Sequence, residues 1–317
     1  MHPDKLTILK IFHCIQDFKS ETRTIVTLGT FDGVHIGHKK IIERLIKARQ
    51  ESDCESLVLT FFPHPRMVLQ ENSEIKLLNT IAERTTLLSD TGLDNLIIHP
   101  FDQEFSRLTA EEFVRDILVE KFNISKIIIG YDHRFGRNRT ATIDDLIAFG
   151  EIYNFEVEQI SAQEIDEVSV SSTKIRTALL EGTIDLANSY LGYEYTLSGI
   201  VIKGKQIGRT INFHTANIHI AEDYKLIPLN GVYIVKSEID RAIVYGMMNI
   251  GFNPTVNGTK QTIEVHFFDF NADIYGKNIQ VAILSRIRAE EKFDSLVRLQ
   301  QELENDKKIA LDYIKNL

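Results

Sequence analysis

The chain has 317 residues, enough for two domains with separate cores, because one domain takes about 100 to 200 residues. Its composition, 43% hydrophobic and 26% charged, is that of a globular protein, and a formal net charge of -9 argues against a DNA or RNA partner. The two cysteines form neither a metal-ligand spacing nor a disulfide framework, which is typical of a reducing compartment. The first residues lack a signal-peptide pattern, and no apolar run has the length of a membrane span. We therefore expect a cytoplasmic protein that acts on small molecules, with no membrane and no nucleic-acid partner.

Short apolar runs alternate with helix-like segments from Thr24 to about Leu191. The expected strands are 25–28, 57–61, 96–98, 127–129 and 155–160. This alternation predicts a parallel, doubly wound α/β sheet of the Rossmann-like kind. A first helix is expected to begin near His38, and capping boxes that start at Thr80 and Thr109 predict two further helices.

After Gly192, strands and turns follow one another without long helices between them. Strands expected at 196–202, 231–235, 243–250 and 263–270 predict a small antiparallel Greek-key barrel. The tail from Arg286 to Leu317 returns to a helical period and is expected to pack against the barrel. Its apolar stripe consists of Phe293, Leu296, Val297, Leu299 and Leu303. The predicted domains are residues 1–185 and 186–317.

The stretch GTFDGVHIGH, residues 29–38, joins the first predicted parallel strand to the first helix. At a helix N-terminus the free N–H groups and the macrodipole favour an anion, and glycines allow the backbone to approach a phosphate. His35 and His38 are then expected to face a triphosphate and to donate hydrogen bonds to charge that develops in a transition state. The alternative is a polar turn without function, but two histidines three apart among three glycines favour phosphate chemistry.

Ser171-Ser-Thr173 precedes a helical pattern, so Ser172 is either an N-cap alone or also a phosphate contact. Arg176 favours the second interpretation, because a residue four positions on lies on the same helical face and a cation there suits a triphosphate. His64, between two prolines at a strand end, is either a docking residue for flavin or nucleotide or part of a structural turn. The loop after the strand at 127–129 adds three arginines that are individually expected to be solvated: Arg134, Arg137 and Arg139.

The second half contains no G-x-x-x-x-G-K-[ST] motif, so it is not a P-loop kinase. Gly204, Gly208 and Arg209 flank a short turn whose amides could hold ATP phosphates. Thr215 and Asn217 lie two apart in extended chain, so both project to one face as hard ligands suited to Mg²⁺. Thr-x-Asn alone would indicate an edge-strand face; its place after the glycine-rich turn favours a metal site.

Glu264 lies in the alternating segment Ile263-Glu-Val-His-Phe267, on the side away from the core. A carboxylate there could take the proton of a hydroxyl that attacks a γ-phosphate, a contribution of about a hundredfold. Because glutamate is common on exposed strand faces, the pattern alone leaves its role open.

Several stretches together resemble a known family. G-x-F-D-G-x-H-x-G-H at 29–38 resembles the signature of the nucleotidyltransferase superfamily, in which the α-phosphate of a nucleotide is attacked and pyrophosphate leaves. TFFPHP at 60–65, GYDHRFGR at 130–137 and VSSTKIR at 170–176 are similar to further blocks of the adenylyltransferase half of prokaryotic bifunctional FAD synthetases. GIVIKGKQIGRTINFHTANI at 199–218, GVY at 231–233, NIG at 249–251 with PT at 254–255, and EVH at 264–266 with DF at 269–270 are similar to the riboflavin kinase module. The chain thus resembles the bifunctional riboflavin kinase/FMN adenylyltransferase family over nearly its whole length.

The resemblance implies that the barrel phosphorylates riboflavin with ATP and Mg²⁺ to give FMN, and that the first domain transfers AMP from ATP to FMN, giving FAD and pyrophosphate. It implies catalytic roles for His35, His38, Arg176 and Glu264, and metal ligation by Thr215 and Asn217. ATP or flavin contacts in the first domain are expected from Gly29, Phe31, Asp32, Gly33, Gly37, His64, Asp132, Ser171, Ser172 and Thr173. In the second domain they are expected from Gly204, Gly208, Arg209, Asn249 and Gly251.

The chain departs from the usual F-P-T-A-N of this family by having His214 where the proline stands. Histidine does not fix the backbone as proline does, so we expect a weaker affinity for magnesium-ATP, with His214 facing solvent. Two alternative functions remain open. The first domain could adenylylate or cytidylylate another small phosphate ester, or the chain could be a flavin-binding regulatory protein whose barrel has lost catalysis. The sequence predicts no particular oligomeric state.

Overall fold

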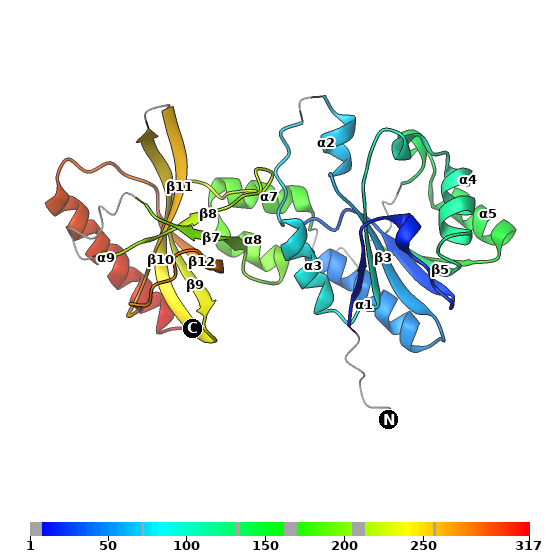
Figure 1. Ribbon diagram of the computed structural model, residues 1–317, viewed down its shortest axis with the longest axis horizontal. Helices are drawn as coiled ribbons and strands as arrows, with labels where there is room; N and C mark the ends of the chain where they lie inside the picture. Colours follow the sequence, from blue (N-terminus) through cyan, green and yellow to red (C-terminus); the bar gives the residue numbers. More distant parts are fainter. Residues whose placement is uncertain (1–7, 72, 131–133, 162–169, 205–212, 256–257) are drawn as a thin grey trace. The chain divides into compact units, whose positions relative to one another are not determined.

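The computed structural model describes residues 8–71, 73–130, 134–161, 170–204, 213–255 and 258–317 (Figure 1). The chain divides into two compact units, Met1–Ser172 and Thr173–Leu317. This division falls before the expected boundary at 185/186, so that most of α7 (Ser172–Glu181) and all of α8 (Ile184–Leu191) belong to the second unit. Asn188 of α8 accounts for part of this, because its Nδ2 donates to the carbonyl of Ile283, 2.9 Å away, in the barrel.

The first unit is built on a six-stranded, wholly parallel sheet, as the alternation of strands and helices predicted. Its strands, in spatial order, are β1 (Lys10–Phe12), β4 (Asn95–His99), β3 (Glu55–Phe61), β2 (Thr24–Leu28), β5 (Ile124–Gly130) and β6 (Glu156–Ile160). β1 is the strand that the sequence did not predict; with three residues it is too short to display a period. β2 lies in the middle, and four of its five residues are buried.

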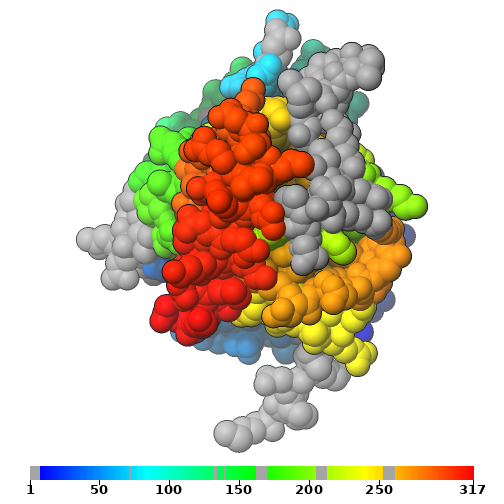
Figure 2. All heavy atoms as spheres, turned by 90° about the vertical axis from the view of Figure 1, so that its left-hand side faces the viewer, coloured from blue at the N-terminus to red at the C-terminus, as the bar shows by residue number. Residues whose placement is uncertain are grey.

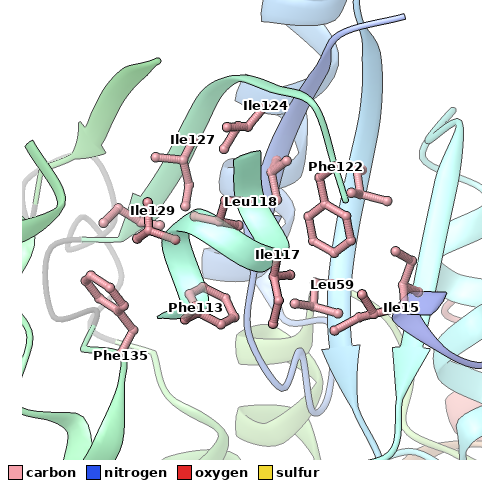
Figure 3. Packing of buried hydrophobic residues seen from close by; sticks show 14 of the residues in the cluster. Ile15, Leu59, Phe113, Ile117, Leu118, Phe122, Ile124, Ile127, Ile129 and Phe135 are labelled. Carbon is pink, nitrogen blue, oxygen red and sulfur yellow. The ribbon is translucent and has the colours of Figure 1, made fainter. Parts of the chain in front are cut away.

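Helices cover both faces of this sheet, and each face has its own apolar core. Alternate residues of a strand enter different cores: Ile127 and Ile129 of β5 pack in one, and Ile128 packs in the other. Figure 3 shows the first core, in which Phe113, Ile117 and Leu118 meet the strand residues. Among the described residues, the helices of this unit are α1 (Ile36–Gln50), α2 (Pro65–Leu69), α3 (Ile81–Ser89), α4 (Ala110–Glu112) and α5 (Ile143–Tyr153), with a π-helical segment η3 (Phe113–Val119) and short 3₁₀ turns η1 (Ile15–Asp17), η2 (Phe105–Arg107) and η4 (Arg137–Arg139).

The predicted capping boxes are confirmed at the starts of α3 and α4. The Thr80 hydroxyl accepts from the N–H of Glu83, whose carboxylate accepts from the N–H of Thr80, and Thr109 and Glu112 repeat the pattern. α1 begins at Ile36, two residues before the expected start, because the side chain of His35 caps it.

The second unit is a closed antiparallel barrel, as predicted. Its spatial order is β10 (Ala242–Thr255), β11 (Gly258–Phe267), β8 (Ala216–His219), β7 (Thr196–Ile202), β12 (Asn278–Arg288) and β9 (Gly231–Ile239). β12 corrects the expected helix start at Arg286, since the strand runs to Arg288 and α9 (Leu296–Ile314) begins eight residues later.

Helix α9 lies over the barrel, where Figure 2 shows it in red. The expected apolar stripe is wrong in its first turn, because Leu296 and Val297 are 57% and 65% exposed. The helix packs instead through its later turns, by Leu303, Ala310, Leu311 and Ile314. Asp306 fixes this face: its carboxylate, fully buried, accepts two hydrogen bonds from Arg288 at 2.9 and 2.8 Å. Within the described residues, no helix is long and apolar enough to cross a membrane.

Candidate active sites

The turn from β2 to α1 lies where the strand order reverses. β2 has β3 on one side and β5 on the other, and ligands of open parallel sheets bind beyond the carboxyl ends of such strands. His35, the N-cap of α1, is buried, and its Nδ1 accepts a hydrogen bond from the N–H of His38 at 3.4 Å. The rings of the two histidines stack with centroids 3.7 Å apart and an interplanar angle of 17°. The two predicted histidines therefore form one unit at a helix N-terminus.

The backbone of this turn is strained. Phe31, Gly33 and Val34 have φ values of 46°, 88° and 36°, a left-handed region that a β-branched residue such as Val34 rarely adopts. Gly29, at the end of β2, leaves room for the Phe31 ring, and Gly37 is buried in the first turn of α1. Such strain persists only where the surrounding structure over-determines the conformation.

The Asp32 side chain connects this turn to the segment before α3. One of its carboxylate oxygens, Oδ1, accepts hydrogen bonds from the N–H groups of Leu78 and Asn79 at 2.9 and 3.4 Å. The same oxygen lies 3.8 Å from Nη2 of Arg84, and both side chains of this ion pair are at most 2% exposed. Asp32, predicted as a ligand contact, is thus buried and bonded to the backbone that precedes α3.

The sequence did not single out Arg84. A signal was present, because Arg84 lies four residues before Leu88 and so shares the buried face of α3. An arginine on the apolar face of a helix needs a partner within the fold.

His38 has an unusual electrostatic environment. Its Nδ1 is buried, and within the described residues that atom has no hydrogen-bond partner. Burial lowers the pKa of His38 well below the usual value, and the neighbouring His35 and the positive charge of Arg84 lower it further. The surroundings of the ring therefore favour its neutral form.

Ser172 reaches the same turn from α7. It is the first helical residue, where an N-cap was expected, and its Oγ donates to the carbonyl of Asp32 at 2.9 Å. Its neighbours Ser171 and Thr173 are exposed, and Arg176 lies half-buried one turn further along the helix. Ser172 is thus brought to the histidine turn, while Arg176 belongs to the second unit.

His64 is the N-cap of α2. Its Nδ1 accepts a hydrogen bond from the N–H of Arg66 at 3.1 Å, and the side chain is buried. This geometry supports the structural-turn interpretation. Of the loop arginines, Arg134 and Arg137 are exposed, as expected, and Asp132 lies outside the described residues.

A second polar cluster lies on the barrel. Asn217 of β8, Glu264 of β11 and Asn249 of β10 are direct cross-strand neighbours, so their side chains share one face. The Thr215 hydroxyl donates to Oε2 of Glu264 at 3.2 Å. Gly204 packs against the Asn217 amide, because a Cβ at this position would lie 2.5 Å from Cγ of Asn217. Five predicted residues of the second unit are therefore brought together.

Gly251 lies on the same strand as Asn249, but its nearest neighbour is Glu290. The Glu290 carboxylate covers it, accepting from the N–H of Phe252 and from the Asn230 amide, both at 3.2 Å. The sequence did not point to Glu290. Gly208 and Arg209 lie outside the described residues.

His214, at the position of the family's proline, is exposed. Its carbonyl lies 2.8 Å from Nδ1 of His266, and its neighbour Phe213 is buried. Burial lowers the pKa of His266, although the His214 carbonyl opposes that effect.

The parallel sheet with its histidine pair and the closed antiparallel barrel with its own polar cluster, together with the family models that match them, define a class of protein, the nucleotide-dependent transferases. The family model for FAD synthetase matches residues 17–174, and that for riboflavin kinase matches residues 191–314. The chain belongs to the bifunctional riboflavin kinase/FMN adenylyltransferase family. The family, and the two activities expected with it, are thereby confirmed.

Relatives match over nearly the whole chain. A bifunctional riboflavin kinase/FMN adenylyltransferase of Buchnera aphidicola subsp. Schizaphis graminum is 36% identical over 312 residues, 96% of this chain and 99% of the relative. The one of Bacillus subtilis is 34% identical over 313 residues, 96% of each chain. A crystal structure of a macrolide-efflux protein from Streptococcus pneumoniae is 32% identical, with a TM-score of 0.87 over 96% of this chain and 98% of that one. Both units of this fold are therefore present in a solved structure.

Proposed function

We propose that the two units divide the reactions of this family between them. The barrel phosphorylates riboflavin with ATP to give FMN, and the parallel-sheet unit transfers AMP from ATP to FMN. The observation that carries this division is that each unit contains its own polar site, the stacked histidine pair in one and the Thr215–Glu264 contact beside Asn217 in the other. The separate matches of the two family models to the two halves support it.

In adenylyl transfer, a phosphate oxygen of FMN attacks the α-phosphorus of ATP, the bond to the β-phosphate oxygen breaks, and pyrophosphate leaves. The N-terminus of α1 favours the triphosphate. His35 accepts the His38 N–H through Nδ1, so its neutral ring carries the proton on Nε2 and can donate it in a hydrogen bond to a phosphate oxygen. His38 is proposed to supply a further donor, and no covalent nucleophile is needed.

In phosphoryl transfer, Glu264 is the proposed general base. It takes the proton of the primary hydroxyl of riboflavin as that oxygen attacks the γ-phosphorus, and ADP leaves with the electrons of the broken bond. The hydrogen bond from Thr215 supports this role, because it orients the carboxylate. The intact cluster also argues against a barrel that has lost catalysis.

The same cluster fits a magnesium ion. Mg²⁺ prefers oxygen ligands and is commonly held by one or two carboxylates together with substrate phosphates. Thr215 and Asn217 offer a hydroxyl and an amide oxygen beside the single carboxylate of Glu264, and the absent side chain of Gly204 leaves the space that the Asn217 amide fills. When bound, the ion would neutralise phosphate charge. We also propose a cytoplasmic location, since Cys14 and Cys54 are free thiols.

The test is to separate the two activities. His38→Ala and Glu264→Ala are each incubated with riboflavin, ATP and Mg²⁺, and in parallel with FMN and ATP, and the flavins are separated by chromatography. We expect His38→Ala to accumulate FMN without FAD, and Glu264→Ala to make FAD only from supplied FMN. Loss of both activities in one folded variant would overturn the division. Adenylylation of a different phosphate ester in preference to FMN would support the alternative substrate.

A further inference from the structure

The strained turn that carries His35 and His38 is linked to two other parts of the sheet unit by one buried arginine. Arg84 of α3 lies beside Asp32, and its Nη1 donates to the Thr60 hydroxyl at 3.3 Å and to the Phe61 carbonyl at 3.5 Å. The Thr60 hydroxyl in turn donates to the carbonyl of Thr30 at 3.0 Å. Arg84 therefore connects the end of β3 to the turn along two routes.

These two routes reach the turn on both sides of Phe31. Thr30 is held through its carbonyl and Asp32 through its carboxylate, and between them Phe31 has a positive φ. A backbone strained in this way needs contacts that exclude the relaxed conformations. The guanidinium is planar and rigid and presents several N–H donors in fixed directions, so it can contact a carboxylate and a hydroxyl at once.

We propose that Arg84 is a positioning residue for adenylyl transfer, which fixes the turn through Asp32 and Thr60 and thereby sets the place of His35 and His38 against the nucleotide. This inference rests on the proposed role of the two histidines. The Phe31 ring, 5.1 Å from the ring of His38, transmits the position of the turn directly to that histidine. The positive charge of Arg84 also acts on His38, in the same direction as burial and as the neighbouring His35.

The variants Arg84→Met and Arg84→Lys distinguish the effect of the contacts that Arg84 makes with Asp32 and Thr60 from the effect of its positive charge. Methionine removes both, so we expect kcat for FAD formation from FMN to fall about a hundredfold, the effect of a displacement of about 1 Å in a catalytic group. Lysine keeps the charge, but one ammonium group cannot span both contacts, so kcat should fall less, about tenfold. Riboflavin phosphorylation by the same preparations should stay at the wild-type rate, because that site lies in the other unit, and a dispersed amide NMR spectrum like that of the wild type shows that the sheet unit is folded.

An NMR titration of His38 supplies a readout that a merely structural role would not move. Burial and His35 keep the pKa of His38 low in every variant, but in Arg84→Met that pKa should rise because the repelling charge of Arg84 is gone, whereas in Arg84→Lys it should stay at the wild-type value. The matched control is Arg49→Met, which breaks an ion pair with Asp94 at 2.9 Å near the start of β3, at the opposite end of that strand from Thr60, and should leave both kcat and the titration unchanged.

Two results would overturn the proposal: a folded Arg84→Met with wild-type kcat, or an unchanged His38 titration in that variant. If Arg84→Met does not fold, Thr60→Val takes its place in the test. Thr60→Val removes only the bridging hydroxyl and should lower kcat several-fold. Wild-type kcat in both Thr60→Val and Arg84→Lys would then exclude the proposal. Active His38→Ala would contradict the proposed function itself, whereas inactive His38→Ala with normal Arg84 variants would contradict this inference alone.

Discussion

A methyl group at Gly204 should impair riboflavin phosphorylation and leave FAD formation from FMN unchanged. In Gly204→Ala the new Cβ would lie 2.5 Å from Cγ and 2.7 Å from Oδ1 of Asn217, whereas ordinary contacts begin at 3.4 Å. The Asn217 amide must therefore move by about 1 Å, away from the place where it would meet the metal ion and phosphate. Displacing one group of a metal site costs about 10- to 100-fold, or about 1.4 to 2.7 kcal/mol.

The assay is riboflavin phosphorylation as a function of magnesium-ATP concentration, with FAD formation from FMN as the internal control. Asn217→Ala and the double variant Gly204→Ala/Asn217→Ala complete a cycle. If the methyl group acts by moving the Asn217 amide, it should have no further effect once that amide is gone. Wild-type kinetics in Gly204→Ala, or losses that add in the double variant, would refute the reasoning.

Three other changes test separate parts of the chain. His214→Pro should lower the KM for magnesium-ATP about two- to fivefold, because proline restricts the free loop by about 0.4 to 1 kcal/mol; a higher KM would contradict this. Burial lowers the pKa of His99, and this effect is larger than the opposite effect of the Asp102 charge. Below pH 6.5 the unfolded chain therefore binds a proton at His99 that the folded chain does not bind, so the free energy of unfolding decreases as the pH falls below 6.5. His99→Asn keeps an acceptor for the Ile15 N–H but removes the titrating group. In urea titrations from pH 7 to 5, the variant should reduce the dependence of the unfolding free energy on pH by up to about 1.4 kcal/mol per pH unit. Equal slopes in the variant and the wild type would exclude His99 as the source of the pH dependence. Arg288→Met leaves the buried Asp306 carboxylate without its cation and should lower the free energy of unfolding by about 3 kcal/mol. The double change Arg288→Met/Asp306→Leu should restore most of that loss. A loss in the single variant too small to measure would contradict the interpretation of Arg288 and Asp306 as a buried ion pair.

Local chemistry explains why much of the fold could be predicted. The capping boxes at Thr80 and Thr109 join residues three positions apart, so their hydrogen bonds are encoded within one turn of chain. β3 and β5, which flank β2, contain the apolar runs 57–59 and 127–129 because both faces of a parallel sheet are buried. Likewise, Thr215 and Asn217 were predicted together from a spacing of two in extended chain.

Other features depend on partners far away in the chain. β1 exists because Lys10–Phe12 pairs with β4, more than eighty residues later, and nothing within its three residues predicts a strand. The exposed first turn of α9 repeats the apolar period of its later turns, yet burial is decided by the barrel and by the Arg288–Asp306 pair. A period indicates which face of a helix is apolar, whereas only the packed neighbours determine how much of that face is covered.

The histidine turn shows the same division. The sequence by itself determined that two histidines and three glycines stand between a strand and a helix, because the glycines and the helix start are local. Only the tertiary structure decided that Asp32 is buried against Leu78, 46 residues away, and that Arg84 lies beside it. A carboxylate looks the same in a sequence whether it contacts a ligand or a backbone N–H. The distinction lies in burial, and burial depends on segments that the sequence does not place side by side.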